Sequence, residues 1–279
     1  MPQDSDWTTR GLDYEPPQID TGTAHAARVY DYILGGKDNY LPDREAAEQL
    51  IRAEPSVQVS VRQNRLFLHR LTRYLAAEAG ISQFLDIGTG IPTSPNVHEI
   101  AQQANPAARV VYVDNDPIVL AHARALLTSS PQGRVAYVHA DMRDAATVLA
   151  APDLTATLDL SRPTALLMLS TLHLITDPVE ARELLGRYLA ALVPGSYLAL
   201  SVATTDSYSQ ATGDEMQSVL RSHGIPVLQR TRAEATELFD GLELADPGVV
   251  LVSQWRPDAG TVQAADAQVG LYCGVAVKR

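Results

Sequence analysis

A glycine turn that follows a short apolar segment is the feature of this chain that most clearly suggests a bound ligand. Residues 84–92 read FLDIGTGIP, so Asp86 ends an apolar run, and Gly88 and Gly90 follow with Thr89 between them. Glycine lets the backbone turn sharply and come close to a ligand. A strand, a glycine turn and a helix in this order place a ligand at the carboxyl edge of a parallel sheet. We therefore predict that Asp86, Gly88, Thr89 and Gly90 contact a cofactor.

Two classes of cofactor could use such a turn, and the neighbouring residues distinguish them. A dinucleotide-binding turn reads G-x-G-x-x-G, but Thr93 occupies the position of the third glycine. The carboxylate of Asp86 would also repel a pyrophosphate. S-adenosyl-L-methionine has no phosphate and carries an ammonium and a sulfonium group, so a carboxylate favours it. The sequence thus predicts S-adenosyl-L-methionine, with a nicotinamide-dependent oxidoreductase as the less favoured alternative.

Two further acids stand at the ends of predicted strands. Asp114 follows the β-branched run 110–113, where an acid in a doubly wound fold hydrogen-bonds the ribose hydroxyls. Asn115 follows it and belongs to the same candidate site. Asp141 comes after the strand 135–139, where it could accept a hydrogen bond from the adenine amino group while Met142 packs on the base. The alternatives are an ordinary turn at Asp114 and an acidic helix start at Asp141.

The candidates for the reacting edge of the site follow a fourth predicted strand, residues 164–170. Ser170 lies where this strand ends, and we predict that it contacts the cofactor. His173 could act as a general base, although a packed histidine in the run Leu-His-Leu is the alternative. A hydroxyl acceptor would need such a base, and Tyr32 is the other candidate. The sequence suggests no metal site.

The elements that hold these residues follow an alternation of strand and helix patterns from Ile81 onward. Such alternation predicts a parallel sheet covered on both faces. The runs 249–255 and 269–278 have no helix between them, so they must pair antiparallel. We expect an α/β fold with a doubly wound, seven-stranded, mostly parallel sheet. Residues 81–279 would form the cofactor-binding domain, and residues 1–80 an N-terminal arm and helical extension.

The N-terminal extension contains an unusual segment, residues 25–40, in which a helical pattern runs into Gly35-Gly36 and a polar, aromatic turn. The paired glycines suggest either a helix C-cap or the hinge of a lid over the ligand. A lid would bring several side chains to the cofactor or to the acceptor pocket: Tyr30, Tyr32, Asn39 and Tyr40. Asn64 interrupts the apolar stripe of a later helix, and Arg65 beside it could reach a carboxylate. A buried, satisfied amide is the alternative for Asn64.

Composition narrows the classes of partner. The chain has 279 residues, 33 acidic and 22 basic, with a formal charge of -11. No block of Lys and Arg could follow a phosphate backbone, so we expect a small-molecule substrate and no nucleic acid. No apolar run is long enough for a membrane span, and the first residues do not resemble a signal peptide, so a cytoplasmic location is expected. The single cysteine, Cys273, should be a core residue.

The order of these features resembles class I S-adenosylmethionine-dependent methyltransferases from about residue 81 to the end. Asp86, Gly88 and Gly90 resemble their first motif, with Pro92 in place of its last glycine, and residues 192–195 (LVPG) resemble the turn before their fifth strand. The segment 27–40, ARVYDYILGGKDNY, with Asn64 and Arg65 downstream, is similar to a bacterial subfamily whose substrates are largely unassigned. The resemblance implies the fold and the cofactor and leaves the methyl acceptor and the oligomeric state open. A non-catalytic sensor that binds the same nucleoside is the remaining alternative.

Overall fold

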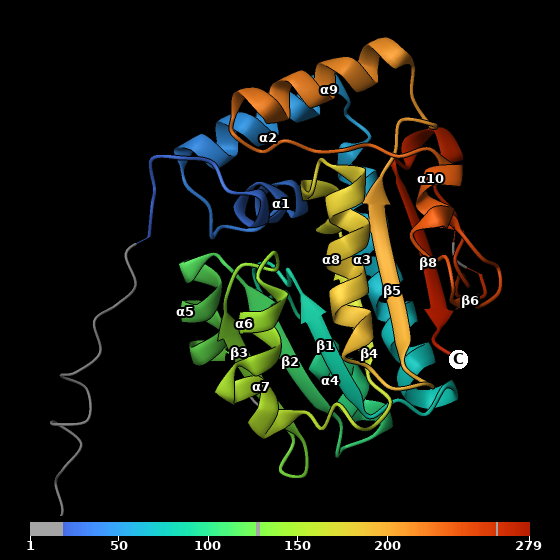
Figure 1. Ribbon diagram of the computed structural model, residues 1–279. Coiled ribbons are helices and arrows are strands. Elements are labelled where there is room, and N and C mark those ends of the chain that lie inside the picture. Colours follow the sequence, from blue (N-terminus) through green and yellow to red (C-terminus); the bar gives the residue numbers. More distant parts are fainter. Residues whose placement is uncertain (1–18, 127–128, 261) are drawn as a thin grey trace, which may run out of the picture.

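The computed structural model describes residues 19–126, 129–260 and 262–279, and these residues form one central sheet flanked by helices (Figure 1). Five strands run parallel and lie in the order β3-β2-β1-β4-β5. Their bounds are β1 (Gln83–Ile87), β2 (Arg109–Asp114), β3 (Arg134–His139), β4 (Ala165–Leu169) and β5 (Tyr197–Ala203). The order reverses direction at β1 and β4, and the candidate site lies at their carboxyl ends. The predicted doubly wound parallel sheet is confirmed.

The antiparallel part of the sheet is built differently from the predicted hairpin. Strand β8 (Leu271–Val277) pairs with β5 on one side. On its other side β8 pairs with two short strands, β6 (Glu243–Leu244) and β7 (Val250–Leu251), at different points along its length. The described sheet therefore has eight strands, but β6 and β7 together occupy a single edge position. Most of the predicted strand 249–255 turns away from the sheet. The reason is that Trp255 is fully buried and packs edge-on against Phe67 in the core.

Helices cover both faces of the sheet, which explains why its strands are continuous apolar runs. One face packs against α6 (Ala145–Ala150), α7 (Pro152–Thr157), α8 (Pro178–Ala190) and α10 (Arg232–Glu237). The other packs against α3 (Val57–Arg73), the turn η1 (Tyr74–Glu78) that continues it, and α4 (Val97–Ala104). Helix α5 (Pro117–Leu126) lies beside β2 and β3. Helix α3 packs directly on the sheet. Of the described helices before β1, only the two that precede α3 stand apart from the sheet.

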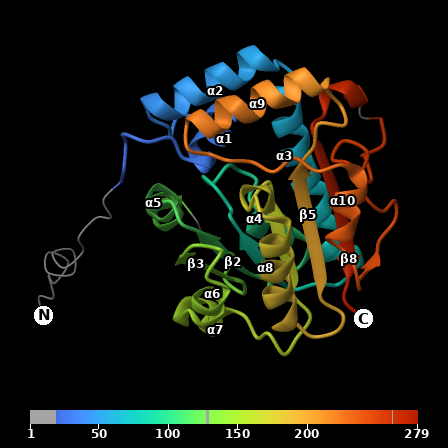
Figure 2. The same ribbon diagram turned by 45° about the horizontal axis from the view of Figure 1, so that its top comes forward.

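Three helices form a cap over the carboxyl edge of the sheet. Helices α1 (Ala26–Leu34) and α2 (Leu41–Ala53) come from the N-terminal part, and α9 (Gln210–Ser222) comes from the segment after β5. Figure 2 shows α2 and α9 side by side over α1, and a separate apolar cluster joins them. Helix α9 is absent from the elements predicted above. Short 3-10 turns, η2 (Leu172–Leu174) and η3 (Asp266–Gln268), complete the fold.

Two other expectations concern the chain as a whole. Cys273 is buried in β8, as predicted for a core residue. None of the helices in the described ranges has the length and apolar composition needed to cross a membrane.

Candidate functional site

A cavity of about 390 Å³ lies between the carboxyl edge of the sheet and the cap. The ends of β1 to β5 form its floor, and α1, α3 and α9 contribute to its roof and side. All of the residues predicted to contact the cofactor lie on its wall: Asp86, Gly88, Thr89, Gly90, Asp114, Asn115, Asp141, Met142 and Ser170. The sheet therefore brings together side chains that are up to 84 positions apart in the sequence.

The glycine turn uses its two glycines for different reasons. Both have a left-handed backbone, with φ of 69° at Gly88 and 68° at Gly90. A Cβ at Gly88 would lie 2.0 Å from Thr171 Cγ2, so this position must remain glycine for the loop to pack against the end of β4. At Gly90 a Cβ would have no heavy atom of the described residues within 4 Å, so its open side can take a ligand. Arg65 holds the far end of the loop by donating to the carbonyls of Thr93 and Pro95.

Asp86 is a buried carboxyl group on the cavity wall, with 4% of its surface exposed. Thr89 Oγ1 donates a hydrogen bond to it over 3.2 Å. Burial raises the pKa of Asp86 to about 7, and the nearby guanidinium of Arg65 only partly offsets this rise. A cation bound in the cavity would stabilise the ionised form and lower the pKa again. Asp86 therefore suits a ligand that carries a positive charge.

Asp114 organises the loop and faces the cavity at the same time. It accepts hydrogen bonds from the backbone N–H of Gly90 over 2.8 Å and of Asp116 over 3.0 Å. Burial raises the pKa of Asp114, and these two bonds oppose the rise. Each carboxylate oxygen keeps a free lone pair for a further donor, so the pair of oxygens can receive a diol.

The residues after β3 combine a local turn with a place on the cavity wall. Asp141 accepts a hydrogen bond from the N–H of Arg143 over 2.9 Å and forms an ion pair with its guanidinium at 3.6 Å. The carbonyl of Met142 accepts a hydrogen bond from the hydroxyl of Tyr188 over 2.8 Å. Asn115 is exposed on the same side. Asp141 thus starts a turn and lies beside the cavity, whereas Asp144 is the N-cap of the helix that follows. The contact with adenine stays a prediction.

A polar cluster connects the end of β4 to the cap. Ser170 has a left-handed backbone, with φ of 55°, which is uncommon for a residue with a side chain and often occurs at functional sites. Asn64 on α3 donates one hydrogen bond to Ser170 Oγ and one to Tyr30 OH, both over 3.0 Å. Its Oδ1 atom is buried and has no hydrogen-bond partner among the described residues. Tyr30, Asn64 and Arg65 therefore lie on the cavity wall as predicted.

His173 lines the cavity, but its environment suits a hydrogen-bond donor better than a base. Its Nδ1 atom accepts a hydrogen bond from the N–H of Ala203 over 3.2 Å, so the neutral ring carries its proton on Nε2. Burial, together with the charge of Arg230, lowers the pKa of His173 to about 3. At neutral pH the ring is uncharged. Nε2 already carries a proton and cannot accept another, and Nδ1 is occupied by the N–H of Ala203. This geometry does not support the role of general base suggested by the sequence.

The other lid candidates have structural contacts away from the cavity wall. Tyr32, the second candidate base, donates its hydroxyl proton to Glu48 over 3.0 Å. Asn39 donates to Asp31 and accepts from Arg44, both over 2.8 Å. Tyr40 is the N-cap of α2, and its backbone N–H donates to Asp43. Among the described residues, none of these three belongs to the cavity wall: the hydroxyl of Tyr32 bonds at the surface, Asn39 is buried, and the ring of Tyr40 packs against the guanidinium of Arg28.

The paired glycines form a packed helix end. Gly35 is the left-handed C-cap of α1, with φ of 90°. A Cβ at Gly36 would lie 1.9 Å from Asp31 Oδ1, so the carboxylate of Asp31 packs directly against the chain here. The same carboxylate accepts from the N–H of Asp38 over 3.0 Å. Of the two interpretations offered by the sequence, this geometry favours a fixed cap.

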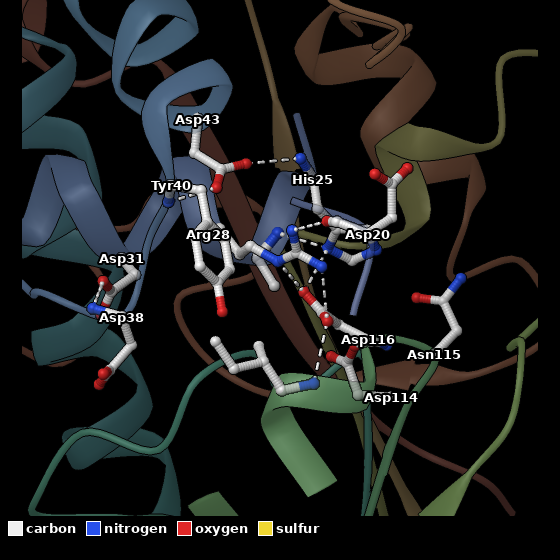
Figure 3. Close-up of polar contacts among 12 residues, drawn as sticks. Asp20, His25, Arg28, Asp31, Asp38, Tyr40, Asp43, Asp114, Asn115 and Asp116 are labelled. Atoms are coloured by element: carbon white, nitrogen blue, oxygen red, sulfur yellow. Dashed lines mark hydrogen bonds and ion pairs between the residues drawn. The ribbon is translucent and has the colours of Figure 1, made fainter. Parts of the chain in front are cut away.

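A buried ion pair that the sequence analysis missed connects the cap to the sheet (Figure 3). Arg28 of α1 donates to both oxygens of Asp116, over 2.7 and 3.0 Å, and both side chains are almost fully buried. Asp116 also caps the helix that follows it, because it accepts a hydrogen bond from the N–H of Ile118 over 3.1 Å. The ion pair stands directly beside Asp114. Its only signal in the sequence is the position of Arg28 on the inner face of α1.

The apolar end of the cavity was also missed. Helix α9 and the loops at either end of it contribute Tyr208, Met216, Leu220 and Ile225 to the wall. Ser209 caps α9 by accepting from the N–H of Thr212 over 3.2 Å. This cap residue and the spacing of Met216 and Leu220 are the signals that could have revealed the helix.

Comparison with solved structures identifies close relatives of this fold. A DUF574 family protein from Streptomyces avermitilis is 49% identical, covers 94% of this chain and 100% of its own, and superposes with a TM-score of 0.91. A protein from Thermobifida fusca, provisionally named a methyltransferase, is 40% identical over 96% of this chain and 99% of its own, with a TM-score of 0.86. A plantazolicin methyltransferase in complex with S-adenosylhomocysteine is only 12% identical, over 91% of this chain and 95% of its own. Its TM-score of 0.50 indicates a shared fold.

Comparison with known protein families and curated proteins shows to which family the chain belongs. No curated protein matched it. The model of the S-adenosyl methyltransferase family matches residues 13–279, which include every element of the cavity. This chain belongs to the S-adenosyl methyltransferase family, and S-adenosyl-L-methionine is its cofactor.

Proposed function

We propose that the protein transfers the methyl group of S-adenosyl-L-methionine to a small molecule that binds under the cap. The observation that carries this proposal is that a single cavity has two kinds of wall: polar residues at the sheet edge, which suit a nucleoside, and apolar residues under α1, α2 and α9. A cofactor and a small acceptor could lie side by side in it. We also infer from the segment 27–40 that the chain is a member of the bacterial subfamily with this N-terminal sequence.

The residues of the sheet edge fit the groups of the cofactor. Asp86 would hold the ammonium group, and Arg65 would reach the carboxylate, since its Nε atom is buried and has no partner within the described ranges. Asp114 would accept the ribose hydroxyls, while Asp141 and Met142 would contact the adenine. Gly90 has no side chain, and the space beside its Cα is open to the cofactor. Asn115, Thr89 and Ser170 would complete the pocket.

The chemistry asks the protein mainly to position two molecules. When bound, S-adenosyl-L-methionine supplies a sulfonium methyl group that is already activated for in-line displacement. The protein must hold a nucleophilic atom on the axis of the sulfur–methyl bond, and the proton of the acceptor leaves to water. His173, which is neutral and protonated on Nε2, would orient the acceptor by donating a hydrogen bond. No strong base is required for an acceptor of sufficient nucleophilicity.

Methyl transfer is tested with cofactor that carries a labelled methyl group. The full chain is incubated with this cofactor and with extracts of metabolites, and the label is followed by chromatography and mass spectrometry. The proposal predicts label in a small molecule, in an amount that grows with the quantity of protein. Tight cofactor binding without transfer to any fraction would instead indicate a sensor, and label found only in protein or nucleic acid would exclude a small-molecule acceptor.

A further inference from the structure

The part of the cavity under the cap forms an apolar chamber. Its wall is mainly aliphatic and comes from α1, α2, α3, α9 and the loop after α9: Val29, Ile33, Leu50, Val57, Val61, Met216, Leu220 and Ile225. Tyr208 also belongs to it, with its hydroxyl 3.1 Å from Ser60 Oγ. The charged side chains of the cavity and its histidines lie at the strand ends, on α3 beside them and at the start of α1: His25, Arg65, Asp86, Asp114, Asp141, Arg143 and His173.

Because the charged side chains lie outside the chamber, a charged ligand would bind poorly in it. A charged group loses its hydration when it enters an apolar site, and this costs several kcal/mol unless an opposite charge replaces the water. The carboxylates and guanidinium groups at the sheet edge are the ones that the cofactor would use. An uncharged and largely apolar molecule avoids this cost and gains free energy from the surface it buries.

One polar atom at the border of the chamber specifies a further property of the ligand. Tyr30 donates its hydroxyl proton to the carbonyl of Val61 over 3.3 Å. In its hydrogen bond with Asn64 the hydroxyl oxygen is therefore the acceptor, and the amide nitrogen of Asn64 is the donor. Asn64 gives its second amide proton to Ser170. The amide nitrogen is therefore fixed toward these two hydroxyls, and Oδ1 faces the other way.

Oδ1 of Asn64 is thus a buried acceptor without a donor. Asn64 is 4% exposed and lines the cavity, and Oδ1 finds no partner in the part of the chain that the structure describes. A buried acceptor that stays unpaired weakens binding by about ten-fold, so a ligand that supplies the missing donor is favoured over one of equal size that does not. The required donor is an O–H or an uncharged N–H group.

We infer that the chamber binds an uncharged, apolar small molecule that presents one hydroxyl or neutral N–H group to Asn64 Oδ1. This inference rests on the proposed function in one respect, since it identifies the chamber ligand with the methyl acceptor. The donor group lies beside Ser170 at the end of β4, next to the cofactor wall.

Three probes with the same propylphenyl frame test the inference by titration calorimetry with the full chain, free and saturated with S-adenosylhomocysteine. They are 4-propylphenol, propylbenzene, which has no donor, and 4-propylbenzoate, which is charged. We expect the phenol to bind at least about ten-fold more tightly than either of the others. Propylbenzene is the most apolar of the three, so a purely hydrophobic chamber would favour it. Equal or tighter binding of propylbenzene or of the benzoate, or no binding of the phenol, would overturn the inference.

Three variants locate the binding. Asn64→Leu removes the acceptor at similar volume and should abolish the preference for the phenol over propylbenzene. Leu220→Trp fills the chamber and should abolish binding of both, whereas Ser218→Trp, on the exposed face of the same helix, should change neither. Unchanged probe binding in Leu220→Trp would show that the probes bind elsewhere and would overturn the inference.

Binding of S-adenosylhomocysteine is measured in the same samples. Its retention in Leu220→Trp shows that the variant is folded. Its absence in the unmodified protein, together with selective binding of the phenol, would count against the proposed function while the chamber inference stands. The reverse result would count against the chamber inference alone.

Discussion

At the scale of single residues, the electrostatics of the site centre on two buried carboxyl groups. Asp86 and Asp114 stand at the ends of neighbouring parallel strands, β1 and β2. Burial raises the pKa of both, and the charge of Asp114 raises the pKa of Asp86 further while that of Asp116 does the same for Asp114. Burial is the larger cause for both. A site in this condition favours a ligand that brings positive charge and hydrogen-bond donors.

The pKa of about 7 at Asp86 predicts a pH dependence of cofactor affinity. Below pH 7 the free protein holds a proton on this carboxyl group, and a cationic ligand must displace it, so affinity should fall as the pH falls. Between pH 7.5 and pH 5.5 we expect a loss of more than about ten-fold in the affinity for S-adenosyl-L-methionine, measured by calorimetry. In Asp86→Asn the affinity should be weaker at pH 7.5 and nearly constant over this range. An equal pH dependence in both proteins would contradict the role of Asp86.

Asp114 should contribute to cofactor affinity through the ribose. Asp114→Asn keeps one acceptor oxygen for the loop but removes the charge and the second acceptor, so we expect cofactor binding to weaken by about 1.5–3 kcal/mol. Asp153→Asn serves as the control, because Asp153 is an exposed carboxylate of α7 away from the cavity. Calorimetry at pH 7.5 compares the two variants. Equal affinities would remove Asp114 from the binding site.

At the scale of elements, the attachment of α1 to the sheet depends on the pair Arg28–Asp116. Removing one partner of a buried ion pair leaves a buried charge, at a cost of about 3–5 kcal/mol. We therefore expect Arg28→Met to lower the free energy of unfolding by this amount in denaturant titrations. Arg73→Met is the matched control, because its pair with Asp258 is more than half exposed on both sides, and it should cost only about 0–1 kcal/mol. A similar small loss in both variants would mean that Arg28 does not anchor the cap.

The fixed-cap interpretation of Gly35-Gly36 makes a separate prediction about stability. A side chain at Gly36 must displace the carboxylate of Asp31, so Gly36→Val should lower the free energy of unfolding by about 1–3 kcal/mol. Gly186 on the exposed side of α8 has space for a Cβ, so Gly186→Val should leave stability unchanged or raise it. If Gly36→Val left stability intact but weakened cofactor binding, the segment would behave as the hinge of a lid.

The elements that were predictable from sequence are those specified by local pattern. The five parallel strands and the acids that end them follow from apolar runs broken by polar residues, and the sheet then brings Asp86, Asp114 and Asp141 to one edge. The place of α9 in the cap and the apolar chamber under it were not predictable in this way. They form because residues far apart in the sequence, such as Ile33 and Met216, pack in one cluster, and a single sequence carries no direct signal for such contacts.

At the scale of the whole molecule, the sheet and the cap have separate tasks. The sheet supplies the polar wall that the cofactor requires, and its covering helices hold that wall rigid. The cap supplies the apolar chamber. It is fastened to the sheet by Arg28–Asp116 and to α3 by the hydrogen bond between Tyr30 and Asn64. Selectivity for the acceptor should therefore change with residues of the cap, and affinity for the cofactor with residues of the strand ends.

A crystal structure of the full chain with S-adenosylhomocysteine tests this division most directly. The account predicts density for the ligand in the cavity, with the ribose hydroxyls on Asp114, the adenine beside Asp141 and Met142, and the amino acid end between Asp86 and Arg65. The chamber beyond Asn64 should remain free for an acceptor. A nucleoside found in the chamber, or ribose hydroxyls out of hydrogen-bond reach of Asp114, would contradict the account.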